Sequence, residues 1–400
     1  MSFETHRRDV LKIGAAAGVL AGLGRWGVAQ DGYERRRGQG RTAAMPPVDM
    51  DAEVGVKHII FIAMAGGVRS RETFGTPANV PNLQAMADEG VLYPRMRTSN
   101  LGHFGATMSI FTGISEARGI RDNARGTDPT MFEYIRKDLG LRQSDVWVTT
   151  SGGPQQTNYS YSVHPDYGPK FGANTLDGDG IFNREFKELL DAYGRPKAME
   201  EAEKDILDRV RKSIGRASDA AENAAATANA AKVEKYILEE LTRGTSSLRG
   251  ANSGDAKALR VARNLVSLFK PTITGVVLQN ADVAHGSFNG YSEVIRRNDE
   301  AIGEIWTAVK EDPELAYSTA IFVLPEFGRN KDLNSRRGLD HGDGSEDLRY
   351  VTGVAWGPGF AKGRVVKDDV RTIDAMYSAC AALGAEPTHA RGQKLKRLLA

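Results

Sequence analysis

Two short clusters of acidic residues and histidines are the part of this 400-residue chain best suited to chemistry. One follows the apolar run 272–280 and the other follows the apolar run 319–324. If both runs are buried strands of one α/β sheet, their carboxyl ends meet at the edge where such sheets bind ligands. Carboxylates and imidazoles are the ligands that Zn²⁺, Mn²⁺ and Fe sites use. We therefore predict one shared metal site, the alternative being two ordinary surface loops. The residues concerned are Asp282, His285, Glu326, Asp340 and His341.

The N-terminus has the pattern of an export signal. Arg7 and Arg8 precede an apolar stretch from Ile13 to Leu23, and small residues suited to cleavage follow at 27–29. This pattern predicts a twin-arginine signal peptide over residues 1–29, the Tat translocase as a partner during export, and a periplasmic or secreted protein. The stretch is shorter than the roughly 20 apolar residues of a membrane-spanning helix. An uncleaved N-terminal anchor is the alternative.

Composition limits the remaining possibilities. Residues 30–54 are polar and rich in Arg and Gly, which predicts a flexible linker. A net charge of +2 argues against a nucleic-acid partner. The single cysteine, Cys380, excludes an intramolecular disulfide and cysteine-based metal sites, and we expect it to be a core residue of a helix.

Apolar runs of strand length alternate with helical patterns from residue 55 to the end of the chain. This alternation predicts an α/β domain over 55–400, with a mostly parallel sheet sandwiched by helices. The strands at 273–278 and 319–324, joined by a helix at 293–309, predict a parallel pair with a right-handed crossover. The other expected elements are strands at 56–64, 145–150 and 351–356 and helices at 81–90, 103–111 and from 373 onward.

An Ala-, Glu- and Lys-rich stretch interrupts this alternation. Its strong helix formers predict a long, solvated helical insertion at about 197–245. A surface for a protein partner on these helices is the alternative.

Several motifs resemble a known superfamily. Pro81-Asn-Leu-Gln-Ala-Met-Ala-Asp-Glu-Gly90 followed by Thr112-Gly113 is similar to the opening of the alkaline phosphatase/sulfatase superfamily. A Gly66-Gly67 pair with Glu72-Thr-Phe74, then Glu326-Phe-Gly-Arg329 and Asp340-His341, resembles a branch of bacterial proteins exported by the twin-arginine route and catalogued as a domain of unknown function. The resemblance runs from about Val56 to Gly359 and implies an alkaline-phosphatase-like fold.

The resemblance also implies roles for individual residues. In the superfamily, two metal ions polarise a phosphate or sulfate ester. Asp282, His285 and His341 match the ligands of the first metal, and Glu326 stands where an aspartate ligates the second. Phe327 replaces a histidine ligand and cannot coordinate. Ala65 or Gly66 replaces a metal-binding aspartate, for which Glu72 could substitute from the next loop.

The superfamily's nucleophile is missing. The position nine residues before Thr112, where the nucleophile is expected, is His103. His103 could be a metal ligand, a nucleophile, a general acid or base, or a structural histidine bonded to backbone carbonyls. The nearby hydroxyls, those of Thr98, Ser99, Thr107 and Ser109, are out of register.

Two further charged residues each have two possible roles. Arg329 either binds a substrate oxyanion or forms a salt bridge, with Asp340 as one candidate partner. Asp299 either faces water or caps a neighbouring helix.

We therefore expect an exported hydrolase of a small phosphate or sulfate ester that uses a divalent metal (Zn, Mn or Ca) and attack by a metal-bound water. Its site residues would be His103 and Arg329 for catalysis, and Asp282, His285, Glu326, Asp340, His341 and Glu72 for the metal. The rival is a catalytically degenerate periplasmic binding or structural protein that keeps the fold and uses the helical insertion to bind a partner.

Overall fold

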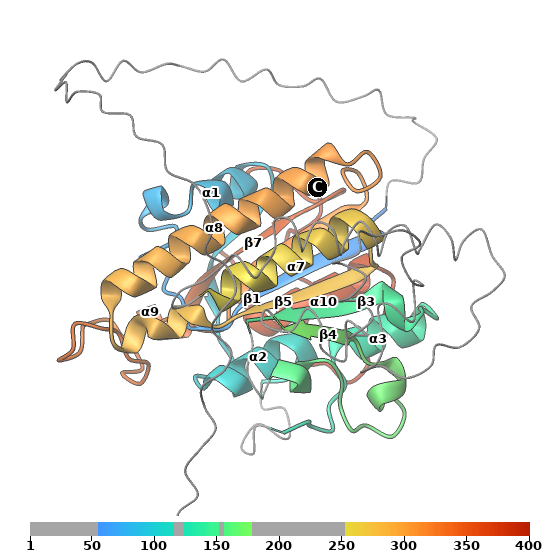
Figure 1. The fold of residues 1–400 in the computed structure, drawn as a ribbon, viewed down its shortest axis with the longest axis horizontal. Helices are drawn as coiled ribbons and strands as arrows, with labels where there is room; N and C mark the ends of the chain where they lie inside the picture. Colours follow the sequence, from blue (N-terminus) through green and yellow to red (C-terminus); the bar gives the residue numbers. More distant parts are fainter. Residues whose placement is uncertain (1–54, 116–123, 152–155, 178–252) are drawn as a thin grey trace, which may run out of the picture. The chain divides into compact units, whose positions relative to one another are not determined.

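A mixed sheet of nine strands organises the described part of the chain (Figure 1). The structure, a computed structural model, describes residues 55–115, 124–151, 156–177 and 253–400. The predicted signal peptide, the linker and the helical insertion lie outside these residues. Within them, no helix is both long and apolar enough to cross a membrane.

The elements follow one another along the chain with helices between most of the strands. The strands are β1 (His58–Met64), β2 (Val91–Arg97), β3 (Val146–Thr150), β4 (Asn174–Asp177), β5 (Ile273–Leu278), β6 (Thr319–Pro325), β7 (Tyr350–Trp356), β8 (Arg364–Val365) and β9 (Val370–Arg371). The helices are α1 (Pro81–Asp88), α2 (His103–Thr112), α3 (Met131–Asp138), α7 (Gly254–Phe269), α8 (Phe288–Glu311), α9 (Glu346–Arg349) and α10 (Thr372–Ala382).

The strands lie in the order β4-β3-β5-β1-β6-β7-β2-β8, and β9 also pairs with β2. Among the described strands, β7 alone runs against the others, since it is antiparallel to both β6 and β2. The predicted mostly parallel sheet is therefore confirmed. β5 and β6 run parallel as predicted, but they are not neighbours, because β1 lies between them and pairs with both.

Side chains alternate across β1 and divide the core into two halves. Ile59, Phe61 and Ala63 face one half, which contains residues of α2, α3 and α10. Ile60 and Ile62 face the other half, which contains residues of α1, α7 and α8. Because both faces of β1 are buried, its sequence is apolar throughout, as expected for a central strand of a sheet covered on both sides. The helix-sandwiched sheet is thus confirmed.

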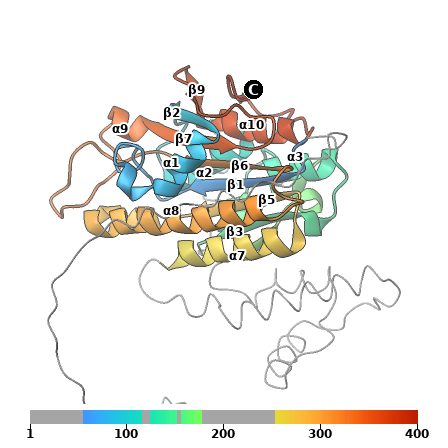
Figure 2. The ribbon, with the colours of Figure 1, turned by 90° about the horizontal axis from the view of Figure 1, so that it is seen from above.

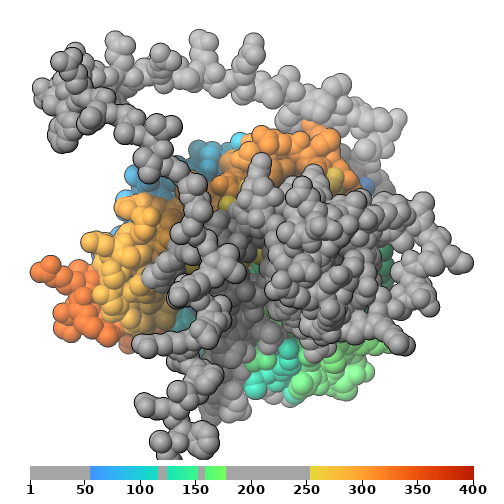
Figure 3. Space-filling view, viewed as in Figure 1, coloured from blue at the N-terminus to red at the C-terminus, as the bar shows by residue number. Residues whose placement is uncertain are grey.

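Helices α7 and α8 lie side by side over one half of the core (Figures 1 and 2). In the space-filling view from the same side, atoms of the yellow and orange segments to which they belong lie at the surface (Figure 3). Ser287 caps the N-terminus of helix α8, and its hydroxyl accepts a hydrogen bond from the backbone N–H of Gly290. Its apolar residues recur at helical spacing on the buried side, as amphipathicity requires.

Asp299, on the buried side of α8, caps a neighbouring helix. Its carboxylate accepts hydrogen bonds from the backbone N–H groups of Asn82 and Leu83, at 3.0 and 2.8 Å. These groups belong to the first turn of α1, whose own N-cap residue, Val80, makes no side-chain cap. The capping alternative is therefore correct, and it ties α1 to α8.

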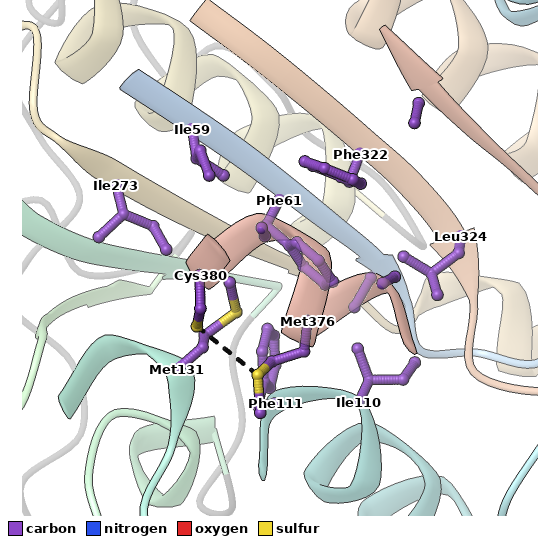
Figure 4. Close-up of a cluster of buried hydrophobic side chains, with 14 of the residues drawn as sticks. Ile59, Phe61, Ile110, Phe111, Met131, Ile273, Phe322, Leu324, Met376 and Cys380 are labelled. Atoms are coloured by element: carbon purple, nitrogen blue, oxygen red, sulfur yellow. Dashed lines mark hydrogen bonds between the residues drawn. The ribbon is translucent and has the colours of Figure 1, made fainter. Parts of the chain in front are cut away.

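Cys380 is a core residue of a helix, as expected, and it lies in the half of the core that contains residues of α2, α3 and α10. Its side chain is fully buried on α10, and its sulfur lies 3.6 Å from that of Met376 (Figure 4). Phe61, Phe111 and Met131 belong to the same apolar cluster.

Candidate metal centre

The candidate site lies where three adjacent parallel strands end. Strands β5, β1 and β6 are neighbours with β1 in the middle, so their carboxyl ends share one edge of the sheet. β5 leads into a short 3-10 helix, Asn280–His285, which supplies Asp282 and His285. Glu326 directly follows β6, and His103 is the first residue of α2.

Four side chains converge there. Ligand atoms of His103, Asp282, His285 and His341 all lie within 4.8 Å of one another. Ligand atoms around a tetrahedral Zn²⁺ are about 3.4 Å apart, because each bond is about 2.0–2.2 Å long. Side-chain movements on the order of 1 Å would let one ion contact all four residues. The two distant segments therefore meet as the sequence predicts, and His103 joins them.

Hydrogen bonds fix the orientation of His103. Its Nδ1 lies 2.5 Å from Glu326 Oε1 and 3.1 Å from the carbonyl oxygen of Ala65, both of which only accept. Nδ1 therefore carries the proton, and Nε2 points into the cluster. Nε2 is buried and lies 2.9 Å from Asp282 Oδ1, with which it forms an ion pair when the imidazole is protonated. A buried imidazole nitrogen beside a carboxylate is suited to a cation once its proton is lost.

The other two histidines are held in the same way. His285 Nδ1 lies 2.6 Å from Asp340 Oδ1, and His341 Nδ1 lies 3.1 Å from the carbonyl oxygen of Leu101. In both, Nδ1–H donates a hydrogen bond to that oxygen, which leaves Nε2 available. Metal-binding histidines characteristically donate their second N–H to a carboxylate or a carbonyl. This shared pattern distinguishes the cluster from a chance group of polar side chains.

Glu326 and Asp340 therefore take a different position from the one predicted. Each was expected to touch the metal, but each lies behind a histidine and belongs to its hydrogen-bonding support. Glu326 is fully buried, and its second oxygen accepts a hydrogen bond of 2.7 Å from the hydroxyl of Thr107.

The charges of the cluster shift its protonation. Burial opposes a charge on His103, but attraction by Glu326 and contact with Asp282 outweigh it and raise the pKa of His103 to about 10. Burial, together with the positive charges of His103 and Arg329, lowers the pKa of His341 to about 4. Burial raises the pKa of Glu326. His341 is consequently neutral at pH 7, the form that binds metals.

Arg329 orients Asp282. Its Nη2 donates to Asp282 Oδ1 at 2.7 Å and to the carbonyl oxygen of Gly66 at 2.5 Å. Its Nε and Nη1 donate to the carbonyl oxygens of Gly67 and Leu339, each at 3.2 Å. These contacts use four of the five N–H groups, and the side chain is fully buried. Of the two predicted roles, Arg329 therefore has the salt bridge, and its partner is Asp282 and not Asp340. Its guanidinium has no pair of free N–H groups with which to bind an ester.

The ion pair with Arg329 also changes the pKa of Asp282. Burial opposes the charge on its carboxylate, but His103 and Arg329 outweigh this effect and hold the pKa of Asp282 well below its usual range. Asp282 is thus an anion at all physiological pH values.

The glycine pair after β1 leaves space for these contacts. A Cβ on Gly66 would lie 2.7–2.8 Å from backbone atoms of Gln279, Ala281 and Asp282. Gly67 has a φ of +67°, and a Cβ there would lie 2.8 Å from Arg329 Nε. A side chain at either position would displace the 3-10 helix or the guanidinium.

Phe327 forms an aromatic wall. It is fully buried, and its ring centroid lies 4.9 Å from that of His103 and 5.0 Å from that of His341. It contributes an apolar surface to the site and, as expected from its residue type, no ligand.

Glu72 is committed elsewhere. Its two carboxylate oxygens accept hydrogen bonds from Arg69 at 2.6 and 2.7 Å, and both side chains are buried. The same guanidinium donates to the carbonyl oxygens of Asn330 and Lys331. The prediction of Glu72 as a metal ligand is therefore corrected, because its charge is balanced by a structural ion pair.

Three supporting groups were not predicted from the sequence. Leu101 acts through its backbone carbonyl, which no side-chain pattern reveals. Thr107 is one turn along α2 from His103, a spacing that would have indicated a shared face. Arg69, three residues before Glu72, is the signal that the glutamate is paired.

Comparison with solved structures identifies the fold. A wild-type alkaline phosphatase, PafA, matches with a TM-score of 0.54 at 9% identity, over 86% of this chain and 99% of that one. A putative sulfatase from Bacteroides thetaiotaomicron matches with a TM-score of 0.51 at 11% identity, over 86% and 74% of the two chains.

The fold is alkaline-phosphatase-like. The part of the predicted resemblance that concerns architecture is therefore confirmed. By sequence, a scan against family models and a search of curated proteins found no match.

Proposed function

We propose that the protein hydrolyses phosphate or sulfate esters with one divalent cation held by His103, Asp282, His285 and His341. The convergence of these four side chains carries the proposal. Its support is their position at the carboxyl edge of a sheet whose fold is shared with an alkaline phosphatase and a sulfatase.

The donor set favours Zn²⁺ or Mn²⁺ over Ca²⁺. Three imidazoles and one carboxylate suit the first two ions, whereas Ca²⁺ takes six to eight oxygen ligands. The buried Nε2 of His103, which lies beside the Asp282 carboxylate, fits this assignment. Such a cation would supply Lewis-acid polarisation of an ester oxygen and activation of a water molecule.

The chain's own residues prepare the site for that chemistry. Glu326 and Asp340 hold His103 and His285 with Nε2 directed inward. Arg329 keeps Asp282 charged and in place. Phe327 covers one side with an apolar ring, which lowers the local dielectric and strengthens charge interactions.

We infer that the nucleophile is a water molecule and not a side-chain hydroxyl. Thr107 and Ser109 are fully buried; the hydroxyl of Thr107 donates to Glu326, and that of Ser109 lies within hydrogen-bond distance of the carbonyl oxygens of Gly105 and Ser115. Neither hydroxyl is exposed to a substrate. Direct attack by water needs no covalent intermediate.

A second candidate is a binding or structural protein that keeps the cation and lacks turnover. Phe327 and Ala65 or Gly66 favour it, because the resemblance places them where the superfamily uses metal ligands. A partner could bind the predicted helical insertion at 197–245. This candidate predicts bound metal without hydrolysis of any ester.

Export completes the proposal. Arg7 and Arg8 at the head of residues 1–29 support passage through the Tat translocase, which carries folded proteins, to the periplasm or beyond. The cation would then be loaded before export. Retention by an uncleaved N-terminal anchor is the variant of this proposal.

Metal analysis with an activity assay tests the hydrolase. We expect about one metal ion per chain and turnover of aryl phosphate or aryl sulfate esters. His341→Ala should lose the metal and reduce kcat/KM by about 100-fold or more, because it removes a ligand. His389→Ala, an exposed histidine outside the cluster, is the matched control. Metal-free protein whose stability is unaffected by chelator would contradict the proposal.

A further inference from the structure

A basic cavity lies beside the start of α10. Its volume is about 330 Å³. It is lined by Arg97 at the end of β2, by Arg371 and Asp374 around the first turn of α10, and by side chains of the C-terminal segment 391–396. None of the four cluster residues of the candidate metal centre lines it.

The lining is strongly positive. Five of its residues are cationic and two are acidic. Asp374 is already satisfied, since its carboxylate accepts hydrogen bonds from the backbone N–H groups of Arg371 and Gln393 and from the guanidinium of Arg371. This pair forms a neutral part of the wall.

Four cations remain to act on a ligand. Within the described residues, no hydrogen bond or ion pair engages the side chains of Arg97, Arg391, Lys394 and Lys396, and all four are exposed. One exposed carboxylate, that of Asp369, faces them. The cavity therefore has an excess of positive charge with no partner of its own.

Its size indicates what it could hold. The volume lies within the range of about 300–1,000 Å³ typical of small-molecule sites. A single tetrahedral oxyanion has only five non-hydrogen atoms and would fill a small part of it. Guanidinium groups bind phosphate and sulfate through paired hydrogen bonds, and lysines add point charges.

We propose that this cavity binds a small organic anion that carries two or more phosphate- or sulfate-like groups. Arg97 and Arg391 would hold the oxyanions, and Lys394 and Lys396 would add charge. The site does not depend on the proposed hydrolase.

The cavity is separate from the metal centre. The backbone N–H of Arg391 donates to the carbonyl oxygen of Gly113, the C-cap of α2, whereas His103 begins the same helix. A helix of ten residues is about 15 Å long. One oxyanion cannot reach both sites.

Calorimetric titration of the protein with benzene-1,3-disulfonate tests the proposal. This probe carries two sulfonates and no ester bond, so the protein cannot hydrolyse it as an ester. We expect saturable binding of one molecule per chain. Arg391→Gln/Lys394→Gln should weaken it by about 10-fold or more, since two charged contacts are lost.

The matched control is Lys362→Gln/Lys367→Gln. It removes the same charge from exposed residues of the same region that do not line the cavity. Its Kd should stay within about twofold of the wild-type value. Equal weakening in both variants, or binding that does not saturate, would overturn the proposal.

Two further measurements separate the alternatives. Inorganic phosphate should bind about 10-fold more weakly than the disulfonate, and equal affinities would overturn the multiply charged ligand. His341→Ala should bind the disulfonate as the wild type does. Loss of disulfonate binding in His341→Ala would place the probe at the metal centre and overturn the proposed cavity site. Loss of ester hydrolysis alone would leave the proposed cavity site intact.

Discussion

At the scale of single residues, the direction of a histidine ring decides what the site can do. Each histidine of the cluster places Nδ1 against an oxygen acceptor of the protein and directs Nε2 inward. The acceptors differ, being Glu326, Asp340 and the backbone of Leu101. Because the support of each ring is separate, each can be tested separately.

Removing the charge of Glu326 should loosen the cation without removing a ligand. Glu326→Gln keeps the size of the side chain but loses the charge that holds His103, so metal affinity should fall about 10- to 100-fold. Competition with a chromophoric chelator would measure it. Glu72→Gln, a buried glutamate paired with Arg69, is the control. We expect it to lower stability and leave metal affinity unchanged.

The same substitution should change the response to pH. The raised pKa of His103 means that it is protonated below about pH 10 in chelator-treated protein. Cation binding must displace this proton, so apparent metal affinity should rise with pH across the neutral range. In Glu326→Gln the pKa of His103 should fall towards its ordinary value of 6.5, because the strongest attraction is lost. NMR titration of the imidazole protons would show this, and an unchanged titration would contradict the role of Glu326.

At the scale of elements, the site depends on how closely β1 approaches the 3-10 helix after β5. Gly66 allows this approach, since a Cβ there would meet three backbone groups. Asp282 and His285 both stand on that 3-10 helix. The strand end therefore sets the position of half of the cluster.

Gly66→Ala should displace the 3-10 helix. We expect a loss of about 1–3 kcal/mol in the free energy of unfolding, together with weakened metal binding, because the backbone must move to accept the methyl group. Chemical denaturation and metal analysis would measure both. Gly286→Ala is the control, since a Cβ there has no neighbour within 4 Å. Similar effects in the two variants would contradict the steric explanation.

The cap that joins α1 to α8 makes a separate prediction. Asp299→Ala removes the acceptor for two backbone N–H groups of α1 and should cost about 1–2 kcal/mol of stability. Urea denaturation would measure it against Glu300→Ala, which alters the exposed neighbour. Metal content should be the same in both.

Elements with strong periodicity could be predicted from the sequence, whereas their pairing could not. The apolar runs of β1, β5 and β6 are recognisable because strands buried on both sides are apolar throughout. The position of β1 between β5 and β6 could not be predicted from the sequence. About 210 residues separate the paired positions Met64 and Leu278, and no local pattern indicates the contact. Helix α7 was also missed.

The site divides in a similar way. All four members of the cluster could be named: Asp282, His285 and His341 from the acid and histidine clusters after apolar runs, and His103 from its position nine residues before Thr112. Whether a carboxylate touches the cation or supports a histidine could not be decided, since Asp282 and Asp340 are the same residue type and both follow strands. The difference lies in which oxygen meets Nδ1, which only the three-dimensional arrangement reveals.

At the scale of the whole molecule, the candidate centre joins segments that are distant in sequence. His103 and His341 are 238 positions apart. The cluster therefore forms only after the sheet has assembled. A chain exported in the folded state would carry the completed cluster with it.

Arg7→Lys/Arg8→Lys should test that route. The paired substitution keeps the charge but alters the twin-arginine motif, so we expect the full-length precursor to accumulate in the cytoplasm. Cell fractionation followed by immunoblotting would measure it. Arg35→Lys/Arg36→Lys, in the predicted linker, is the control. Undiminished periplasmic protein in the signal variant would exclude the twin-arginine route.

The burial of Cys380, the single cysteine, has a practical consequence. Burial raises the pKa of the Cys380 thiol, and the side chain has no exposed surface. Thiol-directed dyes and spin labels should therefore leave the native protein unmodified. A cysteine introduced at an exposed position, such as Lys394→Cys, would then be the only site labelled, and spectroscopic probes could report on ligand binding without a cysteine-free background.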